Sequence, residues 1–332
     1  MAGAVEMVEV WRGDMAESRH RGHAVVCDTD GEIVAAWGDP QAVIYPRSSV
    51  KMIQALPLIE SGAADAAGLD DGELALACAS HEGAPLHVGR VAAWLGRLGF
   101  AEADLRCGAQ PSRDRAERKR MLIAGEAPSQ LHNNCSGKHA GFLTLSRHLG
   151  GGSDYNDPDH PVQRAVRAAF EEVTGLESPC HAVDGCSAPN YATTMHGLAR
   201  AMGFFAGARA DAADSRARAA GRLVDAMRAH PDLVAGEGRA CTEMMRAMAG
   251  RAAVKTGAEG VFVAILPDRC LGVALKIEDG ATRASEAAIA GLLAHLGALD
   301  RDHPAVRKRL GAPIVNWRGV ATGEVRLAFG FA

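Results

Sequence analysis

Strand-like segments lie at both ends of this chain of 332 residues, and helical patterns fill its middle. Short apolar runs bounded by turn residues predict strands at 5–11, 22–27, 32–37 and 42–45, and again at 260–266 and 271–277. The sequence Asp-Thr-Asp-Gly at 28–31 suits a hairpin turn between the second and third strands. This order predicts one sheet built from both termini, with a helical region inserted between them.

Apolar residues recur at helical spacing through the middle of the chain and near its end. The predicted helices are Val88–Leu98, Ala140–Leu149, Val162–Thr174, Tyr191–Met202, Arg216–Arg228, Glu243–Ala249 and Ala284–Leu296. A further helix is expected to begin at Ser48, a suitable N-cap, and to end near Gly62. We therefore expect a mixed α/β (α+β) fold with an antiparallel sheet. It would form a single two-lobed domain over 1–332, with 1–60 and 251–332 as the sheet lobe and 61–250 as the mainly helical lobe.

Composition places the chain among soluble globular proteins, because 48% of its residues are hydrophobic and 23% are charged. No apolar run reaches the roughly 18 residues of a membrane span, and the first residues lack a basic, apolar leader. The net charge is −4, and the densest basic stretch, Arg113–Arg120, is interrupted by two acidic residues and suits a solvated helix face. We expect a cytoplasmic protein that binds neither nucleic acid nor membrane.

Eight cysteines without a C-x-x-C motif do not describe a disulfide scaffold, so reduced thiols are expected. Cys135 and Cys186 differ from the others because they lie in polar segments that contain glycine. Cys180 lies near Cys186, and the sequence does not assign it to either group. The remaining five are expected to be small buried hydrophobic residues: Cys27, Cys78, Cys107, Cys241 and Cys270.

Lysine is rare in this chain, since only six of its 36 basic residues are lysine and the others are arginine. A lysine can lose its proton when it is desolvated and then act as a base or a ligand, which an arginine cannot do. Three of the lysines fall in motifs that carry chemistry: Lys51, Lys138 and Lys255.

Two short motifs suggest an activated serine. Ser48–Lys51 reads S-x-x-K, and if both residues lie on one helix face the lysine can activate the serine as a nucleophile. Lys255–Gly257 reads K-T-G at the start of the C-terminal strands. These are two of the three signatures of serine β-lactamases and penicillin-binding proteins. The third, S-D-N, is absent, and Ser80 is a candidate second serine.

Two polar segments suggest a metal site. His132–Gly141 holds two asparagines, a cysteine, a lysine and two histidines before a predicted helix, although an asparagine-rich helix cap is the structural alternative. Asp184–Asn190 places an acid close to a thiol. Cys135 and Cys186 could supply soft ligands to Zn²⁺, with Lys138 or His139 as a further ligand.

Taken together, these segments resemble the asparaginase II family, the rhizobial-type, class 3 L-asparaginases. The resemblance extends from Glu17 to Arg326 and rests on five ordered motifs. They are the segments 43–58, 78–81, 132–141, 184–189 and 255–260. The resemblance implies a fold related to serine β-lactamases and glutaminases, hydrolysis of L-asparagine to L-aspartate and ammonia, and a homodimer.

The resemblance also implies roles for individual residues. It pairs Ser48 with Lys51 and Ser80 with Lys255 as the catalytic groups. It places a zinc ion, which is not necessarily required for the chemistry, between Cys135, Lys138 and Cys186. Substrate binding is assigned to Arg47, His139 and Asp184, the last being suited to pair with the α-ammonium group of the substrate.

Two segments depart from the family pattern. Residues 81–85 read H-E-G-A-P where the family tends to read H-S-G-E-P, so Glu82 adds a negative charge near Ser80. Residues 107–110 read C-G-A-Q where the family tends to read C-G-P-H, which places Gln110 at the last position. Both leave the expected catalytic groups in place, but they leave the affinity and the pH optimum open.

The expected mechanism begins with attack by Ser48 on the amide carbon, with Lys51 as the general base and Ser80 and Lys255 relaying protons. Ser80 is the alternative nucleophile. Three other functions stay open at this point. A β-lactamase or peptidase would use the same two short motifs. A glutaminase differs by one methylene of pocket length. A zinc-dependent ligand-sensing module would use the cysteines without catalysis.

Overall fold

The computed structural model describes residues 3–332. The chain divides into two compact units. The first unit comprises the residues up to Ser49 together with Thr193–Gly207 and Glu243–Ala332. The second comprises Val50–Ala192 and Ala208–Thr242. The chain therefore passes from one unit to the other four times.

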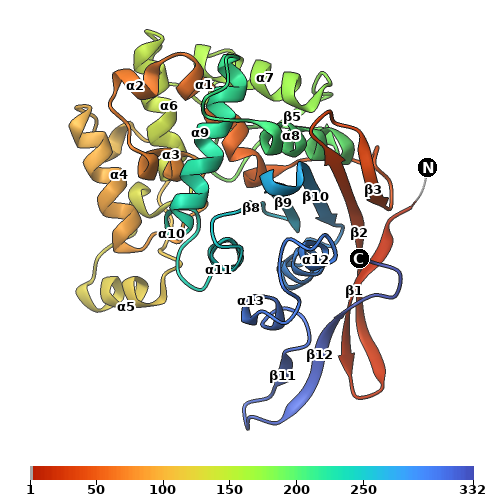
Figure 1. Ribbon diagram of the computed structural model, residues 1–332. Coiled ribbons are helices and arrows are strands. Elements are labelled where there is room, and N and C mark those ends of the chain that lie inside the picture. Colours follow the sequence, from red (N-terminus) through yellow and green to blue (C-terminus); the bar gives the residue numbers. More distant parts are fainter. Residues whose placement is uncertain (1–2) are drawn as a thin grey trace. The chain divides into compact units, whose positions relative to one another are not determined.

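An antiparallel sheet of eight strands forms the centre of the first unit (Figure 1). The strand order is β11-β12-β1-β2-β10-β9-β8, and β3 pairs with β2. The strands are β1 (Val5–Arg12), β2 (Met15–Asp28), β3 (Ile33–Trp37), β8 (Ala253–Thr256), β9 (Val261–Leu266), β10 (Leu271–Ile277), β11 (Pro313–Val315) and β12 (Ala321–Leu327). The N-terminal strand β2 pairs with the C-terminal strand β10. This topology confirms the predicted fold class.

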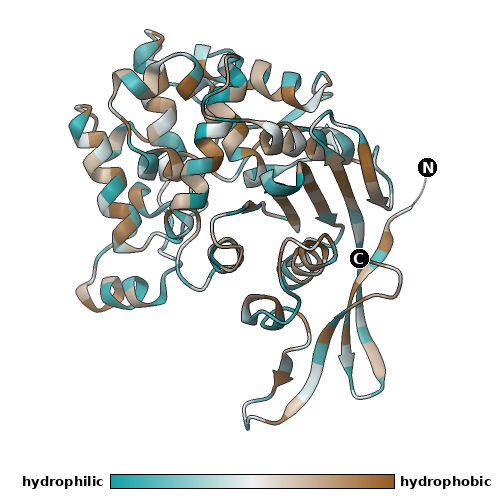
Figure 2. Ribbon diagram, in the orientation of Figure 1, coloured by the Kyte–Doolittle hydropathy of each residue, from teal (hydrophilic) through white to brown (hydrophobic). Residues whose placement is uncertain are grey.

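Helices cover the central strands on both faces. All six residues of β9 are buried, and successive side chains of a strand point to opposite faces. Helices α8 (Met195–Gly207) and α12 (Thr282–His295) both contact β9 and β10. Figure 2 shows hydrophobic residues concentrated in these strands. The first unit also contains β4 (Val43–Ile44), β7 (Thr193–Thr194) and α13 (Pro304–Arg307).

The second unit is mainly helical, and α1 (Lys51–Glu60) is buried along nearly its whole length. It is packed by α6 (Ser136–His148), α7 (Pro161–Thr174) and α9 (Ser215–Ala229). The remaining elements are α2 (Ala63–Ala66), α3 (Asp71–Ala77), α4 (Pro85–Arg97), α5 (Arg115–Ala124), β5 (His181–Val183), β6 (Pro189–Tyr191) and α10 (Pro231–Val234). Helix α11 (Ala240–Ala247) begins in the second unit and ends in the first.

Several predicted boundaries are wrong. Residues Arg47–Val50 form a 3-10 turn, so Ser48 is not an N-cap, and α1 begins only at Lys51. The helix predicted from Tyr191 begins at Met195, because β6 and β7 precede it. The K-T-G motif does not open strand β9; its lysine and threonine end strand β8. Cys270 is exposed, whereas the other four cysteines predicted as core residues are buried.

Candidate functional site

The segment that carries Ser48 is a strained turn in the first unit. Arg47 has a φ of 54°, in the left-handed region that residues with a Cβ rarely adopt. Two hydrogen bonds close the turn, because the Oγ of Ser49 lies 2.7 Å and its N 3.2 Å from Pro46 O. Ser48 itself is half-buried. Strain of this kind costs about 1–3 kcal/mol and is common at functional sites.

Lys51, the first residue of α1, is fully buried and surrounded by acceptors. Its Nζ atom donates to the carbonyl oxygen of Ala79 and lies 3.1 Å from Ser80 Oγ. It also lies 3.1 Å from Cys135 Sγ. Lys51 therefore joins the candidate serine Ser80 to one of the candidate metal ligands within a single unit.

Ser80 lies in the segment between α3 and α4, which neighbouring loops hold at several points. Its backbone N–H donates to Val234 O at 2.9 Å, and the N–H of His81 donates to Asn134 O at 3.2 Å. His81 Nε2 lies 3.0 Å from the Oγ of Ser136, the first residue of α6. These bonds fix Ser80 against the start of α6.

Lys255 lies in β8 of the first unit and is fully buried. Its Nζ donates to Thr256 O at 2.7 Å. Ser48 and Lys255 belong to the first unit, whereas Lys51 and Ser80 belong to the second. The predicted pairings of Ser48 with Lys51 and of Ser80 with Lys255 therefore stay predictions.

The two thiols that were expected to bind metal lie together in the second unit. Cys135 precedes α6, and Cys186 lies in the loop between β5 and β6. Lys138 Nζ lies 3.0 Å from Cys186 Sγ. All three side chains are at most 3% exposed.

A hydrogen bond between the two thiols shifts their pKa values in opposite directions. The Cys135 thiol donates to Cys186, and together with the Lys138 ammonium group this holds the pKa of Cys186 well below its usual value. The same hydrogen bond, together with burial, raises the pKa of Cys135. Burial opposes the charge of Lys138, but the adjacent sulfur of Cys186 outweighs it and raises the lysine pKa. These shifts favour a thiolate at Cys186 beside an ammonium group at Lys138.

His139 lies beside this cluster. Its Nδ1 is 2.9 Å from the hydroxyl of Tyr155, which accepts a hydrogen bond from the N–H of Arg106. Burial lowers the pKa of His139 to about 4, although the nearby Cys186 opposes the shift. Its Nε2 is buried without a nitrogen or oxygen partner among residues 3–332, and the ring interacts with the Cys186 side chain. The sequence did not indicate Tyr155 as a site residue. The one feature that sets it apart in the sequence is that the chain has only three tyrosines.

The donor set fits a soft metal ion. Two thiols, a lysine amine and a histidine ring gather in one buried cluster, and sulfur and nitrogen are the ligands that Zn²⁺ prefers. Asp184 lies at the edge of the cluster, with its Oδ2 3.8 Å from Cys186 Sγ. Within residues 3–332, no three His, Cys, Asp or Glu side chains form a metal-binding group. The predicted ligand set, Cys135, Lys138 and Cys186, includes a lysine and therefore differs from such groups. Zinc binding by these three residues stays a prediction.

The two departures from the family pattern occupy defined positions. The Glu82 carboxylate is buried and accepts a hydrogen bond from the N–H of Glu237 at 3.0 Å. Burial raises its pKa. The side chain of Gln110 accepts from the N–H of Asn134 at 3.3 Å. Both residues thus support loops next to Ser80 and Cys135.

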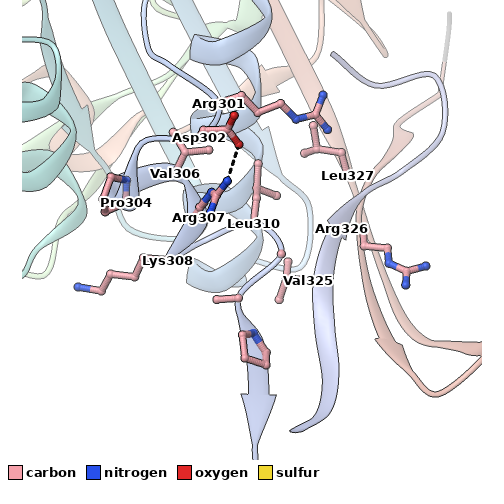
Figure 3. Close-up of a pocket in the computed structure, with 13 residues that line it drawn as sticks. Arg301, Asp302, Pro304, Val306, Arg307, Lys308, Leu310, Val325, Arg326 and Leu327 are labelled. Carbon is pink, nitrogen blue, oxygen red and sulfur yellow. Dashed lines mark hydrogen bonds and ion pairs between the residues drawn. The ribbon is translucent and has the colours of Figure 1, made fainter.

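A cavity of about 920 Å³ lies elsewhere in the first unit, between α13 and the β11–β12 hairpin (Figure 3). Its lining includes four cationic residues, but Arg307 pairs with Asp302, Lys308 with Glu243 and Arg326 with Glu324. Leu310 and Leu327 are among its apolar residues. None of the predicted catalytic or metal-binding residues lines it.

Comparison with known proteins identifies the family. The family model described as L-asparaginase II matches residues 8–327, which is nearly the whole chain. The chain belongs to the L-asparaginase II family. The predicted family resemblance is confirmed, and membership supports amidohydrolase activity on a small-molecule substrate.

Solved structures with a similar fold have low sequence identity to this chain. A β-lactamase from Mycobacterium bovis is 12% identical with a TM-score of 0.45, covering 83% of this chain and 94% of that chain. Mglu in its native form is 13% identical with a TM-score of 0.49, covering 91% of this chain and 70% of that chain. No curated protein matches the chain. No helix among residues 3–332 of this family member combines the length and apolar character needed to cross a bilayer.

Proposed function

We propose that this member of the family is an L-asparaginase, which hydrolyses the side-chain amide of L-asparagine to L-aspartate and ammonia. The observation that carries the proposal is the buried lysine Lys51, whose Nζ lies 3.1 Å from Ser80 Oγ, in a chain that matches the family over residues 8–327. A buried amine within hydrogen-bonding distance of a serine suits proton transfer between the two groups, which Ser80 needs both as a proton relay and as the alternative nucleophile.

In the proposed mechanism, Ser48 attacks the amide carbon, and the amine of Lys51 accepts the serine proton as the general base. Ser80 and Lys255 carry a proton to the amide nitrogen, which leaves as ammonia. Water then hydrolyses the ester formed with Ser48, releasing L-aspartate and restoring the serine. The backbone N–H of Ser48 is a candidate donor to the developing oxyanion. The hydrogen bond between Lys51 and Ser80 supports proton exchange between these two residues.

The substrate is proposed to bind through three residues. Asp184 pairs with the α-ammonium group of asparagine, and Arg47 and His139 contact the rest of the amino acid. Burial lowers the pKa of His139, which favours contact with the substrate through hydrogen bonds rather than charge.

A zinc ion is proposed to be held by Cys135, Lys138 and Cys186. The two buried sulfur atoms and the amine of Lys138, whose Nζ lies 3.0 Å from Cys186 Sγ, support this assignment. When bound, the ion would order the surrounding loops and orient the substrate. Because the pKa values of Cys135 and Lys138 are raised, both would have to release a proton when the ion binds, so binding would depend on pH.

A homodimer and a cytoplasmic location are also proposed, the first on the family resemblance and the second on the character of the sequence. Size-exclusion chromatography with light scattering tests the dimer directly. A mass of one chain at micromolar concentration would contradict it.

Ammonia release from L-asparagine and L-glutamine by the purified protein tests the proposed function. We expect brisk release from asparagine, weaker release from glutamine, and loss of turnover in Ser48→Ala with unchanged circular dichroism and thermal unfolding. The loss reflects removal of the attacking oxygen. A near-wild-type rate in Ser48→Ala would overturn that nucleophile. Absence of release from both amides by the folded, zinc-loaded protein would overturn the asparaginase assignment.

A further inference from the structure

Lys276 is a lysine in an arginine-rich chain that no motif of the proposed mechanism uses. It lies near the end of β10 and is about half-buried. Its Nζ donates to three backbone carbonyls: Glu259 O at 2.8 Å, Ile277 O at 2.5 Å and, weakly, Glu278 O at 3.5 Å. An ammonium group offers three donors from one atom, whereas a guanidinium spreads its donors over a plane. The convergence of three acceptors therefore explains why lysine stands here.

The turn that Lys276 binds is strained. It joins β8 to β9 through residues 257–260, directly after Lys255 and Thr256. Glu259 has a φ of 58°, in the left-handed region, although it is not glycine. Such a conformation costs on the order of 1 kcal/mol and persists only where the surroundings enforce it. The ammonium group of Lys276 binds the carbonyl of that same residue.

The turn is packed against the segment that carries Ser48, within the same unit. A Cβ at Gly257 would lie 2.8 Å from Pro46 O and 3.3 Å from Ser49 Cβ. The absence of a side chain at Gly257 therefore permits this close approach. A shift of the turn would move Lys255 on one side and the Pro46–Ser49 segment on the other.

We propose that Lys276 is a positioning residue for the reaction, which holds the 257–260 turn in its strained conformation and thereby fixes both Lys255 and the Ser48 segment. This inference rests on the proposed function, because the position of the turn affects the reaction only if Ser48 and Lys255 are catalytic residues. Burial lowers the pKa of Lys276, while the neighbouring carboxylates of Glu259, Glu278 and Asp279 oppose that shift and favour the charged form. The ammonium form is the one that serves three carbonyl acceptors.

Lys276→Met tests the proposal, because it removes the three donors and keeps a side chain of similar length. Misplacing reacting groups by about 1 Å can cost on the order of a hundredfold in rate. We therefore expect kcat for ammonia release to fall at least about tenfold while KM changes less than about threefold. Lys119→Met is the matched control, since Lys119 is exposed on α5 and belongs to no proposed site. It should leave both constants unchanged.

Hydrogen–deuterium exchange supplies a readout that does not depend on activity. The N–H of Gly257 donates to Val261 O at 2.7 Å, and that of Ile277 donates to Gly260 O at 3.0 Å. In Lys276→Met, exchange at these two amides should accelerate at least about tenfold relative to amides of β9. Lys276→Gln, with two donors on a shorter side chain, serves the same measurement if the methionine variant does not fold.

A second substitution tests the physical cause. Glycine adopts a positive φ without strain, so Glu259→Gly should restore part of the lost kcat and exchange protection in the Lys276→Met background. Unchanged exchange in Lys276→Met, accelerated exchange with unchanged kcat, or no restoration by Glu259→Gly would each overturn the proposal. If the wild-type protein releases no ammonia, the proposed function fails, while the exchange experiment still decides whether Lys276 holds the turn.

Discussion

At the scale of single residues, three of the six lysines are buried almost completely. Lys51 and Lys255 are 0% exposed and Lys138 is 3% exposed. The sequence could indicate these positions, because lysine is rare in a chain whose other basic residues are arginine. It could not indicate that Lys51 lies 3.1 Å from both Ser80 and Cys135, since those contacts join residues 29 and 84 positions away along the chain.

Two buried histidines beside Ser80 show how burial sets protonation. The rings of His81 and His87 are stacked with centroids 4.8 Å apart. Burial lowers the pKa of both, and the neighbouring His87 lowers the pKa of His81 further. His87 Nε2 bonds to the backbone oxygen of Asp232 at 3.0 Å, while its Nδ1 has no partner in the described chain. Both environments therefore favour the neutral ring.

This stack predicts a loss of stability in acid. The folded pKa of His87 lies below its ordinary value of 6.5, so below that pH the unfolded state binds more protons and stability falls as pH falls. His87→Phe preserves the stacked ring without the proton. We expect the pH dependence of the free energy of unfolding below about pH 6.5 to become shallower by up to about 1 kcal/mol per pH unit.

Urea unfolding at several pH values between 4 and 8 measures this change. Loss of the hydrogen bond to Asp232 should cost about 1 kcal/mol at every pH, so the slope rather than the absolute stability is the readout. His148→Phe is the control, because His148 is exposed on α6 and should not alter the slope. An unchanged slope in His87→Phe would contradict the prediction.

At the scale of elements, local patterns predicted the central strands and failed where pairing is non-local. Strand β12 pairs with β1 across almost the whole length of the chain, and its residues are half-buried or exposed, so it lacks a clear apolar pattern. The turn at Ser48 differs from the predicted helix start for another reason. Serine is a common N-cap, but here it lies in a 3-10 turn whose shape depends on the left-handed conformation of Arg47. Propensity does not reveal such a conformation.

The contact between α8 and the sheet depends on two glycines. A Cβ at Gly272 of β10 would lie 1.9 Å from the backbone N of Gly203 in α8, and a Cβ at Gly203 would lie 2.1 Å from Asp28 O. Backbone therefore packs directly on backbone at this point. No flexible side chain is available to move away.

Gly272→Ala should accordingly destabilise the protein by about 3 kcal/mol or more, because α8 must shift away from β10 to admit the methyl group. Thermal or urea unfolding measures the loss. Gly89→Ala is a matched control within a helix, where a Cβ would meet nothing within 4 Å. Removing that glycine from helix α4 should stabilise the protein by roughly 0.5–1 kcal/mol. Equal effects of the two substitutions would contradict the close backbone packing.

At the scale of the whole molecule, the sequence predicted a sheet drawn from both termini, and the structure pairs β2 with β10 and β1 with β12. It gave no sign that Thr193–Gly207 would return to the first unit, because helix α8 has the same periodicity as its neighbours. The three proposed zinc ligands, by contrast, all belong to the second unit. Zinc should therefore act on the stability of one unit.

Removal of zinc is expected to loosen the second unit selectively. The amide of His139 donates to Cys135 O and that of Asp184 to Ala188 O, next to the proposed ligands. Exchange at these amides should accelerate after chelation and recover when zinc returns, while amides of β9 and β10 stay unchanged. A ligand at 100 times its Kd stabilises the state it binds by about 2.7 kcal/mol, which is a readily measured difference in exchange.

Cys186→Ala should abolish the response of these amides to chelation. Cys180→Ala, which removes an exposed thiol, should retain it. Equal responses in both variants, or a response spread over β9 and β10, would refute the assignment of these ligands.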